Sequence, residues 1–186
     1  MVDQLTIQTV GVLVAASSVV LYLLNLFMAN RREERNKKVA LSQTFLQSLL
    51  SAESSKNWAE MLNAKWDSFE DFMRKYDSTV NPEFFGKRWT FFNTFDLLGY
   101  LMRKDLVDKE TVLKGGGYLS IYMWAKYKPV IDEYRKIAYP RNMYSDFEYL
   151  AHEMRREIRL GDPDFVTDKT HFSDDVLVRT FGADPR

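Results

Sequence analysis

Apolar residues form two kinds of pattern along the chain. From Leu5 to Ala29, 25 consecutive residues carry no charged side chain, whereas from Leu41 onward apolar residues recur every three or four positions among charged ones. A helix over the first stretch extends for about 37 Å at ~1.5 Å per residue, which exceeds the roughly 30 Å hydrocarbon core of a bilayer. The second pattern is typical of helices that bury one face. The sequence therefore predicts an all-α protein with one N-terminal transmembrane helix and a helical domain.

The residues that flank this stretch predict its orientation. A cleaved signal peptide is not expected, because the N-terminal flank carries Asp3 and no base, and the apolar stretch is too long. By the positive-inside rule, bases on the C-terminal side place the N-terminus outside and the remainder in the cytoplasm. We therefore expect a single-pass protein of the plasma (inner) membrane. The topology-setting bases, which also suit anionic headgroups of the lipid bilayer, are Arg31, Arg32, Arg35, Lys37 and Lys38.

Helix signals divide the cytoplasmic part. The membrane helix is expected to continue as a stalk to about Ala52, and a second helix to run from Ser54 or Ser55 to Met73. Asn81-Pro82-Glu83 combines an Asn cap, a proline at the first helical position and an acid in the first turn, so it predicts the start of a core helix that runs to residue 104.

Three further helices are predicted after this core helix. Asp108 is expected to cap a short one that precedes Gly115-Gly116-Gly117, and Tyr139-Pro140 to end the next, which covers 118–137. The tetrad 145–148, Ser-Asp-Phe-Glu, reads as a capping box for the last. The predicted organisation is a bundle of about five helices after the span. Its segments are an anchor over 1–30, a basic stalk over 31–53, a helical domain over 54–160 and an extended acidic arm over 161–186.

Charge separates these segments. The chain has 26 bases and 26 acids, and it has no cysteine. The zero net charge is inconsistent with the basic excess of a nucleic-acid-binding protein, so no nucleic acid is expected as a partner. Residues 31–161 are basic and residues 162–186 acidic. The arm is too apolar for an inert tail, so its side chains are expected to pack on the domain or contact a partner; the candidates are Phe165, Phe172, Leu177 and Phe181.

Motifs for catalysis or cofactors are missing from the sequence. His152 begins His-Glu-Met-Arg-Arg, in which Arg156 stands where a zincin helix needs its second histidine. The acids after Gly161 lack the ligand spacing of an EF-hand loop. The glycine triplet lacks the following Lys-Ser/Thr of a phosphate-binding loop, so a flexible link or a close helix approach is expected there. No histidine lies in the span to hold haem. We therefore expect no enzyme activity, no metal and no cofactor.

One polar pair stands out in the most apolar helix. Asn93 and Asp96 lie three residues apart among Phe, Trp, Leu and Tyr. A buried carboxylate must be neutral or paired, so the favoured interpretation is an ion pair that fixes helix register, with Arg88, Arg103 or Arg135 as the partner. The alternative is a ligand pocket near Asn93 and Asp96.

Three segments carry a family resemblance. These are FFNTFDLLGYLMRKDLVDKETV, YMWAKYKPVIDEYR and YSDFEYLAHEM. With them, residues 5–158 resemble an uncharacterised prokaryotic family of short membrane-anchored helical proteins, catalogued only as a domain of unknown function. The resemblance implies an anchored helical architecture and a prokaryotic source, and it implies no activity.

Two functions fit these observations. The first is a non-catalytic accessory or scaffold subunit that packs against other membrane protein subunits, of a respiratory or photosynthetic complex for example, since 27 aromatic residues suit interfaces. The second is a membrane-tethered sensor or ligand-binding module. A concave polar-lined pocket favours the second, and a solid core would exclude it.

Overall fold

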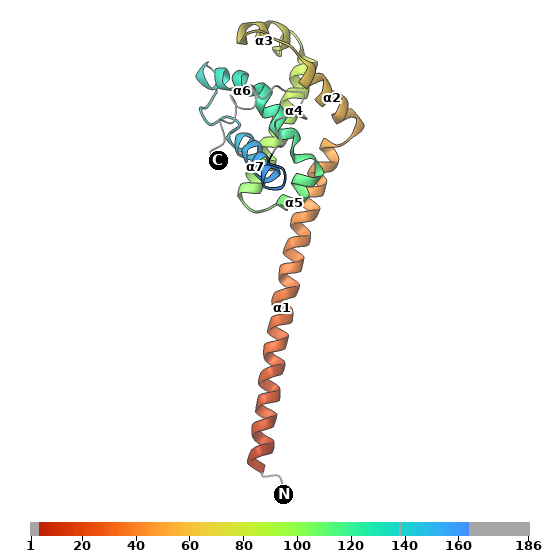
Figure 1. Cartoon of the computed structure of the whole chain (residues 1–186), viewed down its shortest axis with the longest axis vertical. Helices are drawn as coiled ribbons and strands as arrows, with labels where there is room; N and C mark the ends of the chain where they lie inside the picture. The colour runs from red at the N-terminus through yellow and green to blue at the C-terminus, as the bar shows by residue number, and fades with distance from the viewer. Residues whose placement is uncertain (1–3, 138, 164–186) are drawn as a thin grey trace. The chain divides into compact units, whose positions relative to one another are not determined.

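The described part of the protein is entirely helical. The computed structural model describes the backbone of residues 4–137 and 139–163, and side chains within these ranges from residue 17 onward, residue 18 excepted. No strand occurs among these residues, so the predicted all-α class is confirmed. The elements are α1 (Gln4–Leu49), α2 (Ala52–Asn63), α3 (Phe69–Tyr76), α4 (Pro82–Arg103), α5 (Lys109–Val112), the π-helical turn η1 (Leu113–Gly117), α6 (Leu119–Ile137) and α7 (Ser145–Gly161) (Figure 1).

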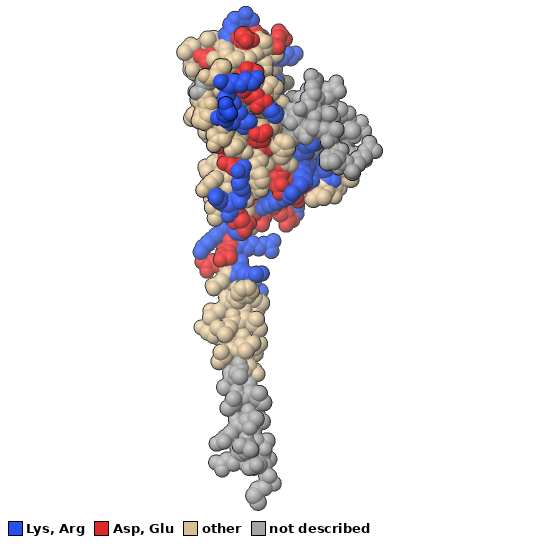
Figure 2. Space-filling model, turned by 90° about the vertical axis from the view of Figure 1, so that its left-hand side faces the viewer, with Lys and Arg blue, Asp and Glu red and all other residues tan. Residues whose placement is uncertain are grey.

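The chain forms two compact units, residues 1–40 and residues 41–186. In the first unit, nine large apolar side chains of α1 between Val19 and Met28 are exposed. Figure 2 shows this uncharged band on α1 and the belt of charged side chains that follows it. Across the described residues, no helix combines the length and the apolar character needed to cross a bilayer.

In the second unit, α4 begins where the sequence predicts. The Asn81 side chain accepts a hydrogen bond from the backbone N–H of Phe84 at 3.0 Å, and Pro82 occupies the first turn, where a missing N–H costs nothing. A buried stripe then follows the helix at three- and four-residue spacing. It consists of Phe84, Arg88, Phe91, Phe92, Phe95, Leu98, Gly99 and Met102.

The core lies among α4, α6 and α7, and α7 packs against both of the other two helices (Figure 1). Phe147 of α7 is fully buried at its centre. Its ring stacks on Phe95 of α4 at 5.1 Å between ring centroids and meets the edge of Trp124 of α6 at 5.1 Å. Aromatic pairs of this geometry stabilise a fold beyond the area that they bury.

The predicted helix from Ser54 or Ser55 to Met73 is two helices, and this prediction was wrong. The break follows Asn63, where the Lys126 ammonium donates hydrogen bonds to the carbonyl oxygens of Leu62 and Ala64 at 2.5 and 2.6 Å. Trp66 packs its ring 5.1 Å from that of Tyr127. Contacts with α6, over 60 residues away in sequence, therefore override the local helical period.

The glycine triplet forms a close helix approach, one of the two expected alternatives. Gly116 has φ of 103°, a left-handed backbone conformation that an L side chain adopts only with strain. At Gly115, an added Cβ would lie 2.1 Å from a methyl carbon of Leu46. The glycines thus allow the turn after α5 to pack against the end of α1.

Candidate functional site

Asp96 holds the start of α7. Its Oδ1 atom accepts hydrogen bonds from the backbone N–H groups of Asp146 at 3.1 Å and Phe147 at 2.9 Å. These N–H groups belong to the first turn of α7, where no local side chain caps them, so the predicted capping box at residues 145–148 was wrong. Burial raises the pKa of Asp96, and the two backbone N–H groups oppose that rise.

The predicted ion pair between Asp96 and an arginine was also wrong, because backbone donors from another helix satisfy the carboxylate. Arg103 pairs with Asp146 at 2.8 Å. Arg135 pairs with Glu148 at 3.0 Å and donates to the carbonyl oxygen of Met143 at 2.9 Å. Both arginines therefore fasten α7 and the segment before it without contacting Asp96.

Asn93 lies at the surface. Its side-chain amide donates to the backbone carbonyl of Trp89 at 2.7 Å, and Asn93 also interacts with the Tyr144 hydroxyl. The predicted membrane-flank bases all lie on α1, where Lys37 pairs with Glu33 at 2.6 Å. The predicted partner-contact residues Phe165, Phe172, Leu177 and Phe181 lie outside the described residues.

Arg88 is a buried cation that forms no close ion pair within the described part of the chain. Its residue is 5% exposed, and it forms no ion pair with a carboxylate of the described residues. Its Nη2 atom donates one long hydrogen bond of 3.5 Å to the Tyr134 hydroxyl, and its Nη1 atom has no hydrogen-bond partner. The guanidinium carbon lies 4.8 Å from the ring centroid of Phe72 and 5.2 Å from that of Phe85. These cation–π contacts compensate the charge only in part.

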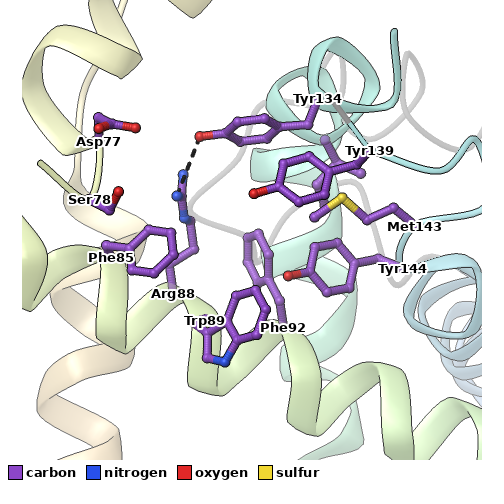
Figure 3. Close-up of a pocket in the computed structure, with 11 residues that line it drawn as sticks. Asp77, Ser78, Phe85, Arg88, Trp89, Phe92, Tyr134, Tyr139, Met143 and Tyr144 are labelled. Atoms are coloured by element: carbon purple, nitrogen blue, oxygen red, sulfur yellow. Dashed lines mark hydrogen bonds between the residues drawn. The ribbon is translucent and has the colours of Figure 1, made fainter. Parts of the chain in front are cut away.

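A cavity of about 110 Å³ lies beside this guanidinium. Figure 3 shows that Tyr134, Tyr139 and Tyr144 direct their hydroxyls toward the side on which Arg88 lies. Trp89, which lines the cavity, is 50% exposed. The residues that line it are Asp77, Ser78, Phe85, Arg88, Trp89, Phe92, Ile131, Tyr134, Tyr139, Met143 and Tyr144.

The turn between α3 and α4 fixes one wall of the cavity. Asp77 ends α3, and its Oδ1 atom accepts hydrogen bonds from the backbone N–H and the hydroxyl of Thr79 at 3.0 and 2.8 Å. The backbone hydrogen bond from Thr79 contributes most to lowering the pKa of Asp77, the hydrogen bond from the Thr79 hydroxyl contributes next, and the charge of Arg88 lowers the pKa further. Asp77 is therefore an ionised carboxylate at neutral pH that faces Arg88 from a distance (Figure 3).

Tyr144 shapes the opposite wall. It has φ of 57° and ψ of 33°, a left-handed conformation that is uncommon for a bulky residue and is found where surrounding structure enforces it. Burial raises the pKa of Tyr144 to about 12. Its hydroxyl thus stays protonated at neutral pH and remains a hydrogen-bond donor.

A comparison with protein families places the chain. The family described as Domain of unknown function (DUF4760) matches residues 6–154. The chain belongs to this family. Searches with this chain found no match among the curated proteins and none among the solved structures. Every residue that lines the cavity lies between Asp77 and Tyr144 and therefore within the range that the DUF4760 family matches.

The arrangement in this DUF4760 chain suits the binding of an anion. A guanidinium offers five donors in one plane, and the neighbouring phenols add neutral donors. No cluster of three or more histidines and acids among the described residues is placed to hold a metal ion.

Sequence reasoning treated Arg88 only as a partner for Asp96. The signal for its burial is present, because Arg88 follows Phe84 by four residues and precedes Phe91 by three, on the buried stripe of α4. A charged residue at an apolar position of a helical stripe indicates either a structural ion pair or a binding site.

Proposed function

We propose that this DUF4760 protein is a membrane-tethered, non-enzymatic module that binds a small anionic ligand in the Arg88 cavity. The observation that carries the proposal is a buried guanidinium that lines a cavity and has no ion pair among the described residues. An unpaired buried charge costs several kcal/mol, so a fold retains one where a ligand completes it.

The alternatives to ligand binding account for this geometry less well. A structural arginine normally has a carboxylate or several carbonyl oxygens as partners, as Arg135 has here. Within the described residues, Arg88 has one long hydrogen bond to a phenol and otherwise lies against aromatic rings. The cavity is also concave, mostly apolar and supplied with a few converging polar groups, which is the usual composition of a small-molecule site.

The tether is supported by the sequence and by the exposure of α1. The stretch from Leu5 to Ala29 has no charged residue, and its described large apolar side chains are exposed on the helix. A helix that is apolar on all sides requires an apolar environment. The five bases that follow favour a cytoplasmic location for the second unit, with the N-terminus outside.

Cysteine labelling tests the tether and its direction, because the chain has no cysteine of its own. A single exposed thiol is introduced as Ser55→Cys, and a second variant carries Gln4→Cys. With a membrane-impermeant maleimide, intact cells should label the Gln4 variant, whereas the Ser55 variant should label only after lysis. Release of the protein by carbonate extraction of the membranes would contradict the tether.

Ligand binding is tested on the detergent-solubilised full chain by thermal unfolding with a panel of small carboxylates, phosphates, sulfonates and neutral analogues. An anion that binds the folded state raises Tm progressively, roughly with the logarithm of its concentration once the concentration exceeds Kd. The Arg88→Met variant should lose that rise. Arg156→Met, which removes an exposed arginine that pairs with Glu153, is the matched control and should keep it. A panel in which no compound raises Tm would refute the ligand-binding proposal.

A second candidate function is that of an accessory subunit, which an exposed face of α4 favours. Trp89, Leu97 and Tyr100 are 50%, 47% and 44% exposed and lie on one side of the helix. Aromatic and leucine side chains grouped in this way are typical of a protein contact. Native sizing after gentle detergent extraction tests it, and migration as a free monomer would contradict it.

A further inference from the structure

We propose that the ligand of the Arg88 cavity is a small organic monocarboxylate with a flat or short apolar body. This inference rests on the proposed binding function and names the chemical class of the ligand. It follows from three features of the cavity: the shape of its donor set, its size and walls, and the second charge at its edge.

The donor set matches a carboxylate. A guanidinium binds a carboxylate through two parallel N–H···O hydrogen bonds, and Arg88 has most of its donors unused. Tyr144 is 8% exposed, and its hydroxyl, like that of any tyrosine, is neutral at physiological pH. It can therefore donate to a carboxylate oxygen without adding charge to the site.

The size and walls of the cavity limit the body of the ligand. At about 110 Å³ the cavity is smaller than the roughly 150 Å³ cavity that accommodates benzene, so it holds a short aliphatic chain, or part of one ring whose remainder stays outside the cavity. The buried Phe92 and the half-exposed Trp89 both line it. These rings offer faces and edges against which a flat body can pack.

Asp77 limits the charge of the ligand to one. Its ionised carboxylate and the Arg88 guanidinium together give the cavity a net charge near zero. A monoanion leaves one negative charge in excess after it binds, whereas a phosphate monoester, which is largely dianionic at neutral pH, leaves two beside Asp77. The site therefore discriminates against phosphates through repulsion by Asp77, a form of specificity that acts against the wrong ligand.

Calorimetric titration of the detergent-solubilised full chain tests this with three ring compounds that differ in charge: benzyl alcohol, benzoate and phenyl phosphate. Benzoate should bind most tightly. Arg88→Met should lower the affinity for benzoate by at least about tenfold. Arg88→Lys keeps the charge and loses the planar pair of donors, so its affinity for benzoate should lie between those of the Met variant and the wild type. The Lys variant keeps the test valid if the Met variant does not fold.

Asp77→Asn tests the discrimination by charge. This substitution should raise the affinity for phenyl phosphate by about tenfold and the affinity for benzoate by less, because the repulsion that it removes is larger for the dianion. Tighter binding of phenyl phosphate than of benzoate to the wild type, or benzoate binding that Arg88→Met leaves unchanged, would overturn the monocarboxylate. If sulfonates or phosphates bind and carboxylates do not, only this inference fails, whereas binding of neutral compounds alone contradicts the proposed function too. If nothing in either panel binds, the proposed function fails with it.

Discussion

Two charged residues of α4, Asp96 and Arg88, lie two turns apart, and the protein treats them differently. Asp96 is half-buried, and two backbone N–H groups of α7 satisfy it. Arg88 is more deeply buried and donates one long hydrogen bond to the Tyr134 hydroxyl. Both side chains lie among aromatic residues, so their surroundings are similarly apolar. They differ in how many hydrogen bonds the fold provides to each charge.

The difference separates a structural charge from a binding charge. A charge that the fold itself satisfies contributes to stability, and its removal leaves orphaned donors. A charge that the fold leaves unsatisfied costs stability, so its retention requires another reason. Asp96 therefore belongs to the architecture, and Arg88 belongs to the cavity. The following changes test this division, from the largest expected effect to the smallest.

Gly99→Ala should have the largest effect on stability. A Cβ at Gly99 would lie 1.9 Å from the carbonyl oxygen of Asp146, so α4 and α7 would have to separate at the point where Asp96 caps α7. We expect a loss of about 3 kcal/mol, measured by urea unfolding of the solubilised full chain. Gly86→Ala is the control on the same helix, where nothing lies within 4 Å of the added Cβ, and it should gain about 0.5 kcal/mol. Equal effects of the two substitutions would contradict the close approach.

Alkaline pH should destabilise the cavity wall through Tyr144. Burial raises the pKa of Tyr144 to about 12, whereas a tyrosine of the unfolded chain titrates near 10. The stability that the protonated hydroxyl contributes is therefore complete below pH 10 and is lost as the pH rises toward 12, by about 2 kcal/mol. Between pH 9 and 12, the free energy of unfolding should fall less steeply for Tyr144→Phe than for the wild type. Parallel curves would show that this hydroxyl does not titrate as a buried group.

Asp96→Ala should cost about 1 kcal/mol, because the first turn of α7 would lose its only side-chain cap among the described residues. Asp96→Asn keeps an oxygen that can accept the same two N–H groups, so it should cost only a few tenths of a kcal/mol. Chemical unfolding at neutral pH distinguishes the two variants. An Asn variant as unstable as the Ala variant would mean that the negative charge is needed, which is the ion-pair arrangement rejected above.

Arg88→Met should leave stability unchanged or raise it by about 0.5 kcal/mol, because it replaces a buried cation that forms no close ion pair among the described residues with an apolar side chain. Arg135→Met provides the contrast and should cost about 1 kcal/mol, since it removes the pair with Glu148. Melting temperatures in the absence of added anions provide the measurement. A large loss of stability in the Arg88 variant would identify that residue as structural and remove the main support for the cavity as a binding site.

Local signals predicted the elements whose causes are themselves local. Asn81 and Pro82 mark the start of α4, and Asp108 caps α5 through Thr111, since each of these side chains acts on its own helix. Long-range contacts defeated the prediction elsewhere. Lys126 of α6 holds the end of α2, and Asp96 of α4 caps α7 from 50 residues away. No pattern within α2 or α7 contains that information.

The candidate site could be predicted only in part. The sequence placed Asn93 and Asp96 on an apolar helix and allowed a pocket nearby, while the cavity lies one turn earlier, around Arg88 and Trp89. Its other walls come from the turn after α3, from α6 and from residues 139–144. These segments meet only through tertiary packing, so the stripe on α4 could have indicated the buried arginine but not the tyrosines that face it.

The cap that Asp96 provides also governs the order in which the second unit assembles. The first turn of α7 has no local cap, so its N–H groups find their acceptor only after α4 has docked. Helix formation and docking thus become a single step, with an inherent delay from closing a long loop. In hydrogen-exchange measurements, the amides of Asp146 and Phe147 should exchange together with those of α4, as one cooperative unit, and more slowly than a fraying helix end would.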